Sequence, residues 1–330
     1  MKKKKKMKVI IPCAVAAVVV IAGGIAVHTS LHDFRDTNSR YRKAVNNITY
    51  LENSIDEALP QTEIYNIIDS HFKSELPEGK KVKKAIVIGY DGCRLDALEG
   101  IDQNPDGALH TFIADGAKLY TSYCGGVPYP KMNTQKTSTA PGWCSMLTGV
   151  WADEHGIKDN GQVKSLDHLT LLTTLVENKT IKNSAFYVSW GGHFEWGDST
   201  YLDEKKYTEE KNLAVTMLCA GDDNGTKENV IADLKNDECS DFIFSILEHC
   251  DHTGHGEGFF AGADVYKQAF KDGDNAAKEI LDAIKSRKTY DEEDWLIIFT
   301  SDHGGTGKVH GFFTIQERYT FIAVNKDLDF

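Results

Sequence analysis

The chain has little positive charge for its length. Its 37 lysine and arginine residues are outnumbered by 49 aspartate and glutamate residues, which gives a formal net charge of −12. An acidic surface of this kind repels polyanions and disfavours nucleic-acid polymers as partners. The sequence also contains no internal repeat and no low-complexity tract beyond its N-terminal lysines, so a repeat architecture is not expected.

The seven cysteines do not follow the spacing of a metal-binding or disulfide framework. Cys219 with Cys239 is the pair that we expect an oxidising exterior to permit. Cys93, Cys144 and Cys250 lie beside the polar motifs described below, where we expect small buried hydrophobic side chains.

One long uncharged run is present, and it lies at the N-terminus. Residues 1–8 contain six lysines, and residues 9–27 carry no charge. A helix of that length spans a hydrocarbon core of about 30 Å. Because positive charge stays inside, we expect residues 1–8 in the cytoplasm, a single-pass transmembrane anchor over 9–27 and the remainder outside the cell membrane. A cleaved signal peptide is the alternative, and the protein would then be secreted.

Residues 28–83 are predicted to be helical. Apolar residues recur at steps of three and four until Pro60 stops the pattern, at Val45, Ile48, Leu51, Ile55 and Leu59. A second short helix is predicted through Ile64, Ile67, Ile68 and Phe72. A stalk and a segment packed on the domain surface both remain open for this region.

Strand and helix patterns alternate over residues 84–330, the expected catalytic domain. Strands are predicted at 85–90, 184–190, 242–248, 295–301 and 320–324, with a long amphipathic helix over 265–284. This alternation predicts an α/β fold, a three-layer α/β/α sandwich around a mostly parallel central sheet. The polar residues 191–238 are too rich in loop signals for the pattern, so we expect a small cap or loop insert there.

Carboxylate and imidazole side chains follow the ends of three predicted strands, where α/β enzymes carry their chemistry. A glycine-rich return then leads to one more histidine. Side chains of these two types suit zinc, and manganese accepts the same donors. The predicted metal ligands among them are Asp91, Asp251, His255, Asp302, His303 and His310.

Thr139 lies at the start of another predicted helix, with Pro141 in the first turn and Gly149 at the end. The free amides and the helix dipole at such a position favour an alkoxide and an incoming phosphate. A helix cap is the structural alternative. A metal that lowers the pKa of the hydroxyl would make Thr139 a nucleophile.

In their order along the chain, these motifs resemble those of the alkaline phosphatase superfamily, and within it the type I phosphodiesterase and nucleotide pyrophosphatase branch. Residues 89–94 resemble the first metal motif of that branch, and 139–141 resemble its threonine nucleophile. Residues 155–160 are similar to a segment whose asparagine, Asn160 here, helps to hold the phosphoryl oxygen, while His155 is expected to fix the loop.

The resemblance implies an alkaline-phosphatase-like fold and two divalent ions, zinc before manganese. One ion would be held by Asp251, His255 and His310, and the other by Asp91, Thr139, Asp302 and His303. Only six residues separate His303 from His310, as in compact bacterial members, phosphomutases and sulfatases. A threonine in place of the cysteine or serine that becomes formylglycine disfavours a sulfatase.

We therefore expect an extracytoplasmic metal-dependent phosphodiesterase or nucleotide pyrophosphatase that hydrolyses small phosphate esters through a phosphothreonine intermediate. A phosphomonoesterase or a phosphoryl-alcohol transferase of the same superfamily is the alternative, and a non-catalytic surface module is a third. Arg94 and Lys136 flank the motifs, where they either form salt bridges or neutralise phosphate. Four aromatic residues either pack in the core or line a substrate pocket: Tyr187, Trp190, Phe194 and Trp196.

Overall fold

The computed structural model describes residues 58–125, 135–312 and 314–328. The expected anchor over 9–27 and the helical pattern over 45–57 lie outside the described residues. Within the described ranges, no helix combines the length and the apolar character needed to cross a membrane.

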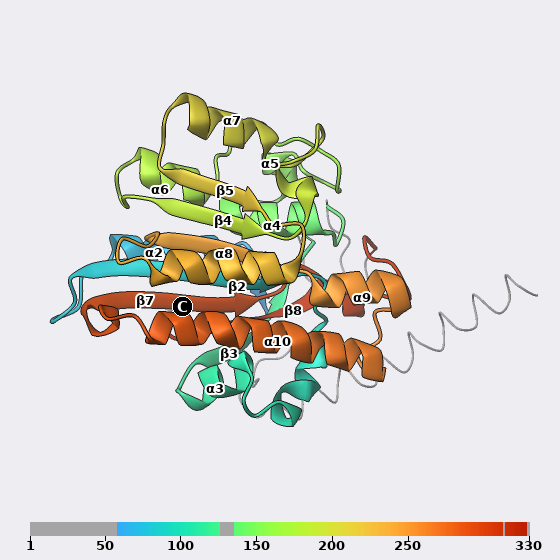
Figure 1. The fold of residues 1–330 in the computed structure, drawn as a ribbon. Helices are drawn as coiled ribbons and strands as arrows, with labels where there is room; N and C mark the ends of the chain where they lie inside the picture. The colour runs from blue at the N-terminus through green and yellow to red at the C-terminus, as the bar shows by residue number, and fades with distance from the viewer. Residues whose placement is uncertain (1–57, 126–134, 313, 329–330) are drawn as a thin grey trace, which may run out of the picture.

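One sheet of eight strands organises the described part of the chain, in the order β1-β3-β8-β7-β2-β6-β4-β5. Every pairing of these strands is parallel except the two made by β8 (Figure 1). The strands are β1 Leu59–Pro60, β2 Val82–Tyr90, β3 Lys118–Tyr123, β4 Ser184–Val188, β5 Val215–Cys219, β6 Phe242–Leu247, β7 Glu293–Thr300 and β8 Tyr319–Val324. The five predicted strands are all present, at β2, β4, β6, β7 and β8.

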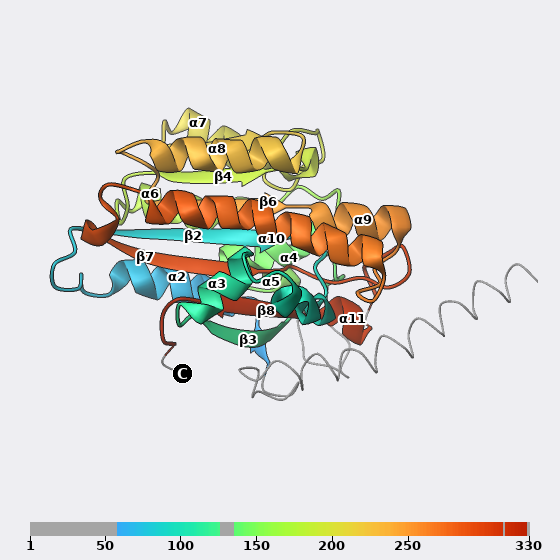
Figure 2. The same ribbon diagram turned by 60° about the horizontal axis from the view of Figure 1, so that its bottom comes forward.

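Helices cover both faces of this sheet. Figure 2 shows α8 and α10 on its near face, with α2 and α4 beyond it. The α-helices are α2 Glu63–Lys73, α3 Ala108–Ala114, α4 Thr139–Thr148, α5 Ala152–His155, α6 Leu171–Glu177, α7 Leu202–Glu210, α8 Asp223–Lys235, α9 His249–Glu257, α10 Asp264–Lys285 and α11 Ile315–Arg318. Short 3-10 helices occupy η2 Leu95–Gln103, η3 Gly191–His193 and η4 Tyr290–Glu292.

Two hydrophobic cores result, one on each side of the sheet. Alternate residues of a strand face opposite sides, so Ile86 and Ile88 of β2 join the core under α3, α8 and α10, whereas Ala85 and Val87 join the core under α2, α4 and α6. The central strands β2, β6 and β7 are nearly continuous apolar runs because helices cover them on both sides. The predicted three-layer α/β/α sandwich is confirmed.

The described part of the segment 28–83 packs on the α/β domain. The helix predicted through Ile64, Ile67 and Ile68 is α2, and these three side chains are buried against the sheet and α4. Strand β1, only two residues long, pairs with β3. Residues 59–73 are therefore a surface layer of the sandwich and not a free stalk.

Residues 191–238 do not form the expected loop insert or cap. They contain α7, and then β5 and α8, and β5 pairs with β4 at the edge of the sheet. Only Met217 of β5 is buried, because an edge strand has a neighbour on one side only. The polar residues of α7 and α8 account for the loop signals of this segment, and β5 is too short to offset them.

The expected pairing of Cys219 with Cys239 is wrong. Cys219 ends β5, whereas Cys239 comes before β6. Because these strands run in the same direction, the two residues lie at opposite edges of the sheet, and both thiols are free. Cys93, Cys144 and Cys250 are buried and free, as expected.

Candidate metal centre and nucleophile

The predicted ligands meet at the carboxyl edge of the sheet. Strand β2 pairs with both β6 and β7, so the residues that follow these three strands emerge side by side. The structure gathers them into two groups, and within each group one ligand atom per residue lies within 4.8 Å of the others. One group is Asp251, His255 and His310, and the other is Asp91, Asp302 and His303.

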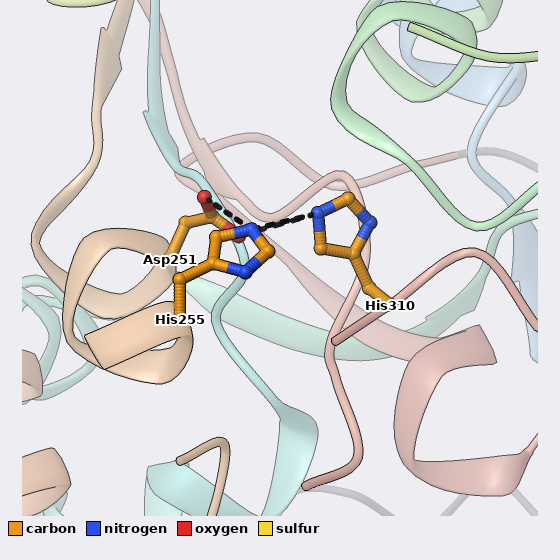
Figure 3. Close-up of side chains that lie close together, drawn as sticks. All are labelled: Asp251, His255 and His310. Atoms are coloured by element: carbon orange, nitrogen blue, oxygen red, sulfur yellow. Dashed lines mark hydrogen bonds and ion pairs between the residues drawn. The ribbon is translucent and has the colours of Figure 1, made fainter. Parts of the chain in front are cut away.

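The first group is built on helix α9 and the glycine-rich loop. Asp251 and His255 lie four residues apart in α9 and therefore share one face of the helix. Figure 3 shows the imidazoles of His255 and His310 directed toward one another, with the carboxylate of Asp251 beside them. The two Nε2 atoms are 3.1 Å apart, and Asp251 oxygens lie 3.4 Å from His255 Nε2 and 3.7 Å from His310 Nε2.

Hydrogen bonds fix the tautomers of these two histidines. His255 Nδ1 lies 3.0 Å from the carbonyl oxygen of Lys308, and His310 Nδ1 lies 3.0 Å from that of Thr137. A carbonyl oxygen only accepts, so each Nδ1 carries the proton and each neutral imidazole keeps its lone pair on Nε2. Two lone pairs that face the same space repel each other, and a cation between them removes that repulsion.

The second group is buried between β2 and β7. His303 donates its Nδ1 proton to the carbonyl oxygen of Gly304 at 2.8 Å, so its Nε2 is again a lone-pair nitrogen. That Nε2 lies 3.3 Å from Asp302 Oδ2 and 3.6 Å from Asp91 Oδ1. The Thr139 hydroxyl lies 3.4 Å from both Asp91 Oδ1 and His303 Nε2, and so belongs to the same group.

The electrostatics of both groups call for positive charge. Burial raises the pKa of Asp91 and of Asp302 well above the ordinary range, and repulsion between neighbouring carboxylates adds to it. Burial also lowers the pKa of His303 well below its usual value, so its imidazole is neutral. Asp251 Oδ1 and Asp302 Oδ2 are buried and accept no hydrogen bond from the described residues. Carboxylates and neutral imidazoles arranged in this way fit divalent cations, which neutralise buried carboxylates.

Thr139 is the first residue of α4, as predicted, and Gly149 ends that helix with a φ of 74°. Asn160 lies beside it, where its Oδ1 accepts the backbone N–H of Ala140 at 2.9 Å. With the oxygen engaged, the Asn160 Nδ2 group is left as the donor near the start of α4.

The loop that carries Asn160 is fixed by His155. His155 Nδ1 accepts the backbone N–H of Ile157 at 3.1 Å, and its Nε2 lies 3.1 Å from Ser145 Oγ on α4. Burial lowers the pKa of this histidine to about 3, so it is neutral. These contacts agree with the structural role expected for His155.

The two basic side chains that flank the motifs, Arg94 and Lys136, form salt bridges. Arg94 is buried and pairs with Asp96 through two hydrogen bonds of 2.9 and 2.7 Å. Lys136 forms an ion pair with Asp159, next to Asn160. Of the two alternatives for these residues, the salt bridge is the one observed.

The four aromatic residues divide between core and surface. Tyr187 and Phe194 are buried, and Tyr187 donates its hydroxyl proton to Asp233. Trp196 is 52% exposed and meets Trp190 edge to face, with ring centroids 5.6 Å apart. Of the four, only these two tryptophans reach the surface.

Three residues near the site were missed by the sequence reasoning. Trp143 donates its indole N–H to Asp91 Oδ2 at 2.9 Å, and Gln61 donates to the carbonyl oxygen of Asp302 at 3.3 Å. Glu248 lies between β6 and α9, where burial and two nearby aspartates raise the pKa of its carboxyl to about 8. Only Trp143 had a sequence signal, since it follows Thr139 by four residues on the same helix.

The model of the type I phosphodiesterase / nucleotide pyrophosphatase family matches residues 85–314. The comparison with curated proteins gives no match.

Among solved structures, murine ectonucleotide pyrophosphatase / phosphodiesterase 5 is similar with a TM-score of 0.45 and 19% identity, over 68% of this chain and 57% of that one. Phosphonate monoester hydrolase of Agrobacterium radiobacter gives a TM-score of 0.49 and 13% identity, over 73% of this chain and 67% of that one. Alkaline phosphatase from the Antarctic bacterium TAB5 gives 0.45 and 14%, over 74% and 91%. The match over residues 85–314 decides the assignment: the chain spans little more than half the length of the murine structure, and it belongs to the type I phosphodiesterase / nucleotide pyrophosphatase family.

Proposed function

We propose that this protein is a phosphoric ester hydrolase that cleaves small phosphodiesters or nucleotide pyrophosphates at a site for two divalent cations, with Thr139 as the nucleophile. One observation carries the proposal. Three imidazoles each donate an Nδ1 proton to a backbone carbonyl and direct Nε2 at buried carboxylates, and the Thr139 hydroxyl lies 3.4 Å from one of these groups. Zinc is the cation that suits these donors best, with manganese as the alternative.

Asp251, His255 and His310 would hold one cation, and Asp91, Asp302 and His303 the other, with Thr139 beside it. Cations bound there supply Lewis acidity, lower the pKa of the threonine hydroxyl and neutralise phosphoryl charge.

The residues of the chain then divide the work of the first step. Thr139 Oγ1 attacks phosphorus as its proton passes to solvent, and Asp91 Oδ1 and His303 Nε2, each 3.4 Å from Oγ1, place the hydroxyl beside the cation that they would hold. The new Thr139–phosphate bond forms as the bond to the leaving alcohol or phosphate breaks on the opposite side. The backbone N–H of Thr139 and Asn160 Nδ2 would face the negative charge of the phosphoryl oxygens, because Pro141 has no N–H and the N–H groups of Ala140 and Gly142 donate to Asn160 Oδ1 and to the Ser138 carbonyl.

In the second step, water attacks the phosphothreonine and the threonine hydroxyl is regenerated. A phosphomonoesterase would share both steps, and a phosphoryl-alcohol transferase would replace the water by an acceptor hydroxyl. Comparing bis(p-nitrophenyl) phosphate with p-nitrophenyl phosphate measures the preference directly. We expect the diester to be the better substrate, and faster cleavage of the monoester would overturn the diesterase assignment.

Replacing the nucleophile is the decisive test. We expect Thr139→Ala to lower kcat by at least about 10³-fold, while elemental analysis finds the metal content unchanged. Thr139→Ser is the matched control, because it keeps a hydroxyl at the same position and should retain part of the activity. Undiminished turnover by Thr139→Ala would remove Thr139 as the nucleophile.

We further propose that residues 9–27 anchor the protein, with 1–8 in the cytoplasm and the catalytic domain 84–330 outside. The support is the uncharged run and the six lysines before it. Protease added to intact cells should remove the catalytic domain, and the mass of the mature chain separates an anchor from a cleaved signal. Full protection from the protease would contradict the proposed location.

A further inference from the structure

The two carboxylate oxygens of Asp91 have different partners. Oδ2 accepts the indole N–H of Trp143 at 2.9 Å. Oδ1 faces the reactive side of the site, 3.4 Å from the Thr139 hydroxyl and 3.6 Å from His303 Nε2. Both Asp91 and Trp143 are buried, so no solvent competes for this hydrogen bond. The indole therefore determines which oxygen is left to bind a cation.

The indole ring has no room to turn. A Cβ atom at position 89 would overlap the six-membered ring of Trp143, so β2 leaves space for the indole only because Gly89 has no side chain. On another side the ring meets Phe244 of β6 edge to face, with centroids 5.7 Å apart. A ring held by two strands of the sheet presents its N–H in one direction.

The same helix carries the indole and the nucleophile. Thr139 and Trp143 are four residues apart in α4 and so lie on one face of the helix. Gly142, between them, packs so closely on Asp302 that a Cβ atom there would lie 2.9 Å from Asp302 Cβ. Helix α4 therefore packs directly on Asp91 and Asp302, the aspartates that follow β2 and β7. This packing fixes the position of Thr139 at the start of the helix.

We propose that Trp143 is a positioning residue for the reaction: it orients Asp91 so that Oδ1 alone faces the cation and sets the distance of the Thr139 hydroxyl from that oxygen. The proposal rests on the proposed function. Trp143 acts through Asp91, as residues that hydrogen-bond a metal ligand commonly do. It would increase the affinity of the Asp91, Asp302 and His303 group for its cation and have no effect on the affinity of the other group.

The chain contains a matched control for the loss of such a hydrogen bond. Trp295 is also buried, and its indole N–H donates to a carboxylate oxygen of Glu293 at 2.8 Å. Trp295 lies in the first half of β7, near the edge of the sheet opposite the metal groups. Trp295→Phe therefore removes the same type of bond at a comparable depth, away from the site.

The test is calorimetric titration of the metal-free protein with Zn²⁺, with Trp143→Phe and Trp295→Phe beside the unchanged chain. We expect Trp143→Phe to weaken one of two sites by about 10- to 100-fold and to leave the other unchanged. We also expect kcat to fall in that variant with KM for the ester nearly constant. Trp295→Phe should alter neither affinity. Equal zinc binding by Trp143→Phe and the unchanged chain would reduce Trp143 to a packing residue.

A double-mutant cycle with Asp91→Asn separates positioning from packing. If Trp143 acts through the Asp91 carboxylate, adding Trp143→Phe to Asp91→Asn should cause little further loss of zinc affinity at that site, whereas a packing effect would add in full. Should Trp143→Phe fail to fold, the indole N–H resonance of Trp143 offers a second measurement in the unchanged chain. Its shift should follow occupancy of this site, and a resonance that ignores zinc would overturn the proposal.

These outcomes are distinct from failure of the proposed function. An unchanged chain that binds no Zn²⁺ or Mn²⁺, or a fully active Thr139→Ala variant, would contradict the metal-dependent threonine mechanism itself. A normal Trp143→Phe variant beside an inactive Thr139→Ala variant would remove only the inference about Trp143.

Discussion

The two metal groups differ in how they are built. Asp91, Asp302 and His303 follow central strands, and the side chains of Asp302 and His303 are fully buried. Asp251 and His255 lie on helix α9, His310 lies on a loop, and the His255 side chain is 47% exposed. The first group is part of the core of the sandwich, whereas the second is attached to its surface. A cation should therefore be more firmly held in the first and exchange more readily in the second.

The largest effect is expected from breaking the buried group. Asp302→Asn keeps an Oδ1 that can accept the backbone N–H of Gly92, observed at 3.1 Å, but it removes the charge. Activity should fall by at least about 10³-fold with loss of one metal equivalent. The metal-free variant should nevertheless be more stable than the metal-free unchanged chain at pH 7, by about 1 kcal/mol or more, because a buried unpaired carboxylate is gone. Chemical denaturation and elemental analysis measure both, and a less stable variant would contradict this account of the buried group.

A smaller and simpler effect is expected at the exposed group. His310→Ala should lose about one metal equivalent per chain and most of the activity. The free energy of unfolding of the metal-free protein should fall by about 1 kcal/mol, because the side chain lies on a loop but is only 9% exposed and donates to the Thr137 carbonyl. Retention of both metals would show that His310 is not a ligand.

The smallest effect concerns the buried carboxyl that supports the exposed group. Glu317 is fully buried, and its Oε2 lies 3.4 Å from Thr137 Oγ1. The backbone carbonyl of Thr137 in turn accepts the hydrogen bond from His310. Burial raises the pKa of Glu317 from its ordinary value of 4.5 to about 7. A raised carboxyl pKa stabilises the fold below pH 4.5, and that contribution is lost as the pH rises to about 7.

Unfolding of the metal-free protein between pH 4.5 and 7 tests this. In the unchanged chain, the free energy of unfolding should decrease by at most about 1.4 kcal/mol per pH unit over this range because of Glu317. In Glu317→Gln this contribution to the slope should be absent. The exposed Glu78→Gln serves as control and should leave the slope unchanged. An identical slope in Glu317→Gln and the unchanged chain would exclude this titration.

The sequence was sufficient where local pattern decides the structure. The apolar runs of β2, β6 and β7 and the polar residues that follow them predict both the parallel sheet and the edge where Asp91, Asp251 and Asp302 meet, since strand ends in a parallel sheet share one edge. The assignment of these residues to two groups came from the family resemblance, and the distances agree with it.

The sequence was insufficient where tertiary contacts decide. Strand β1 has two residues, too few for any periodicity, and β5 is a run of only five residues between the polar helices α7 and α8. The bond from Trp143 to Asp91 depends on the space above Gly89, and the bond from Gln61 to the Asp302 carbonyl joins residues 241 positions apart. No spacing rule connects such partners.

The hydrogen bond from His310 to the Thr137 carbonyl joins the two halves of the centre by a short stretch of backbone. Thr137 stands two residues before Thr139, so the segment whose carbonyl holds His310 also leads into α4. A change in the position of residues 137–139 would therefore move Thr139 beside one metal group and His310 in the other.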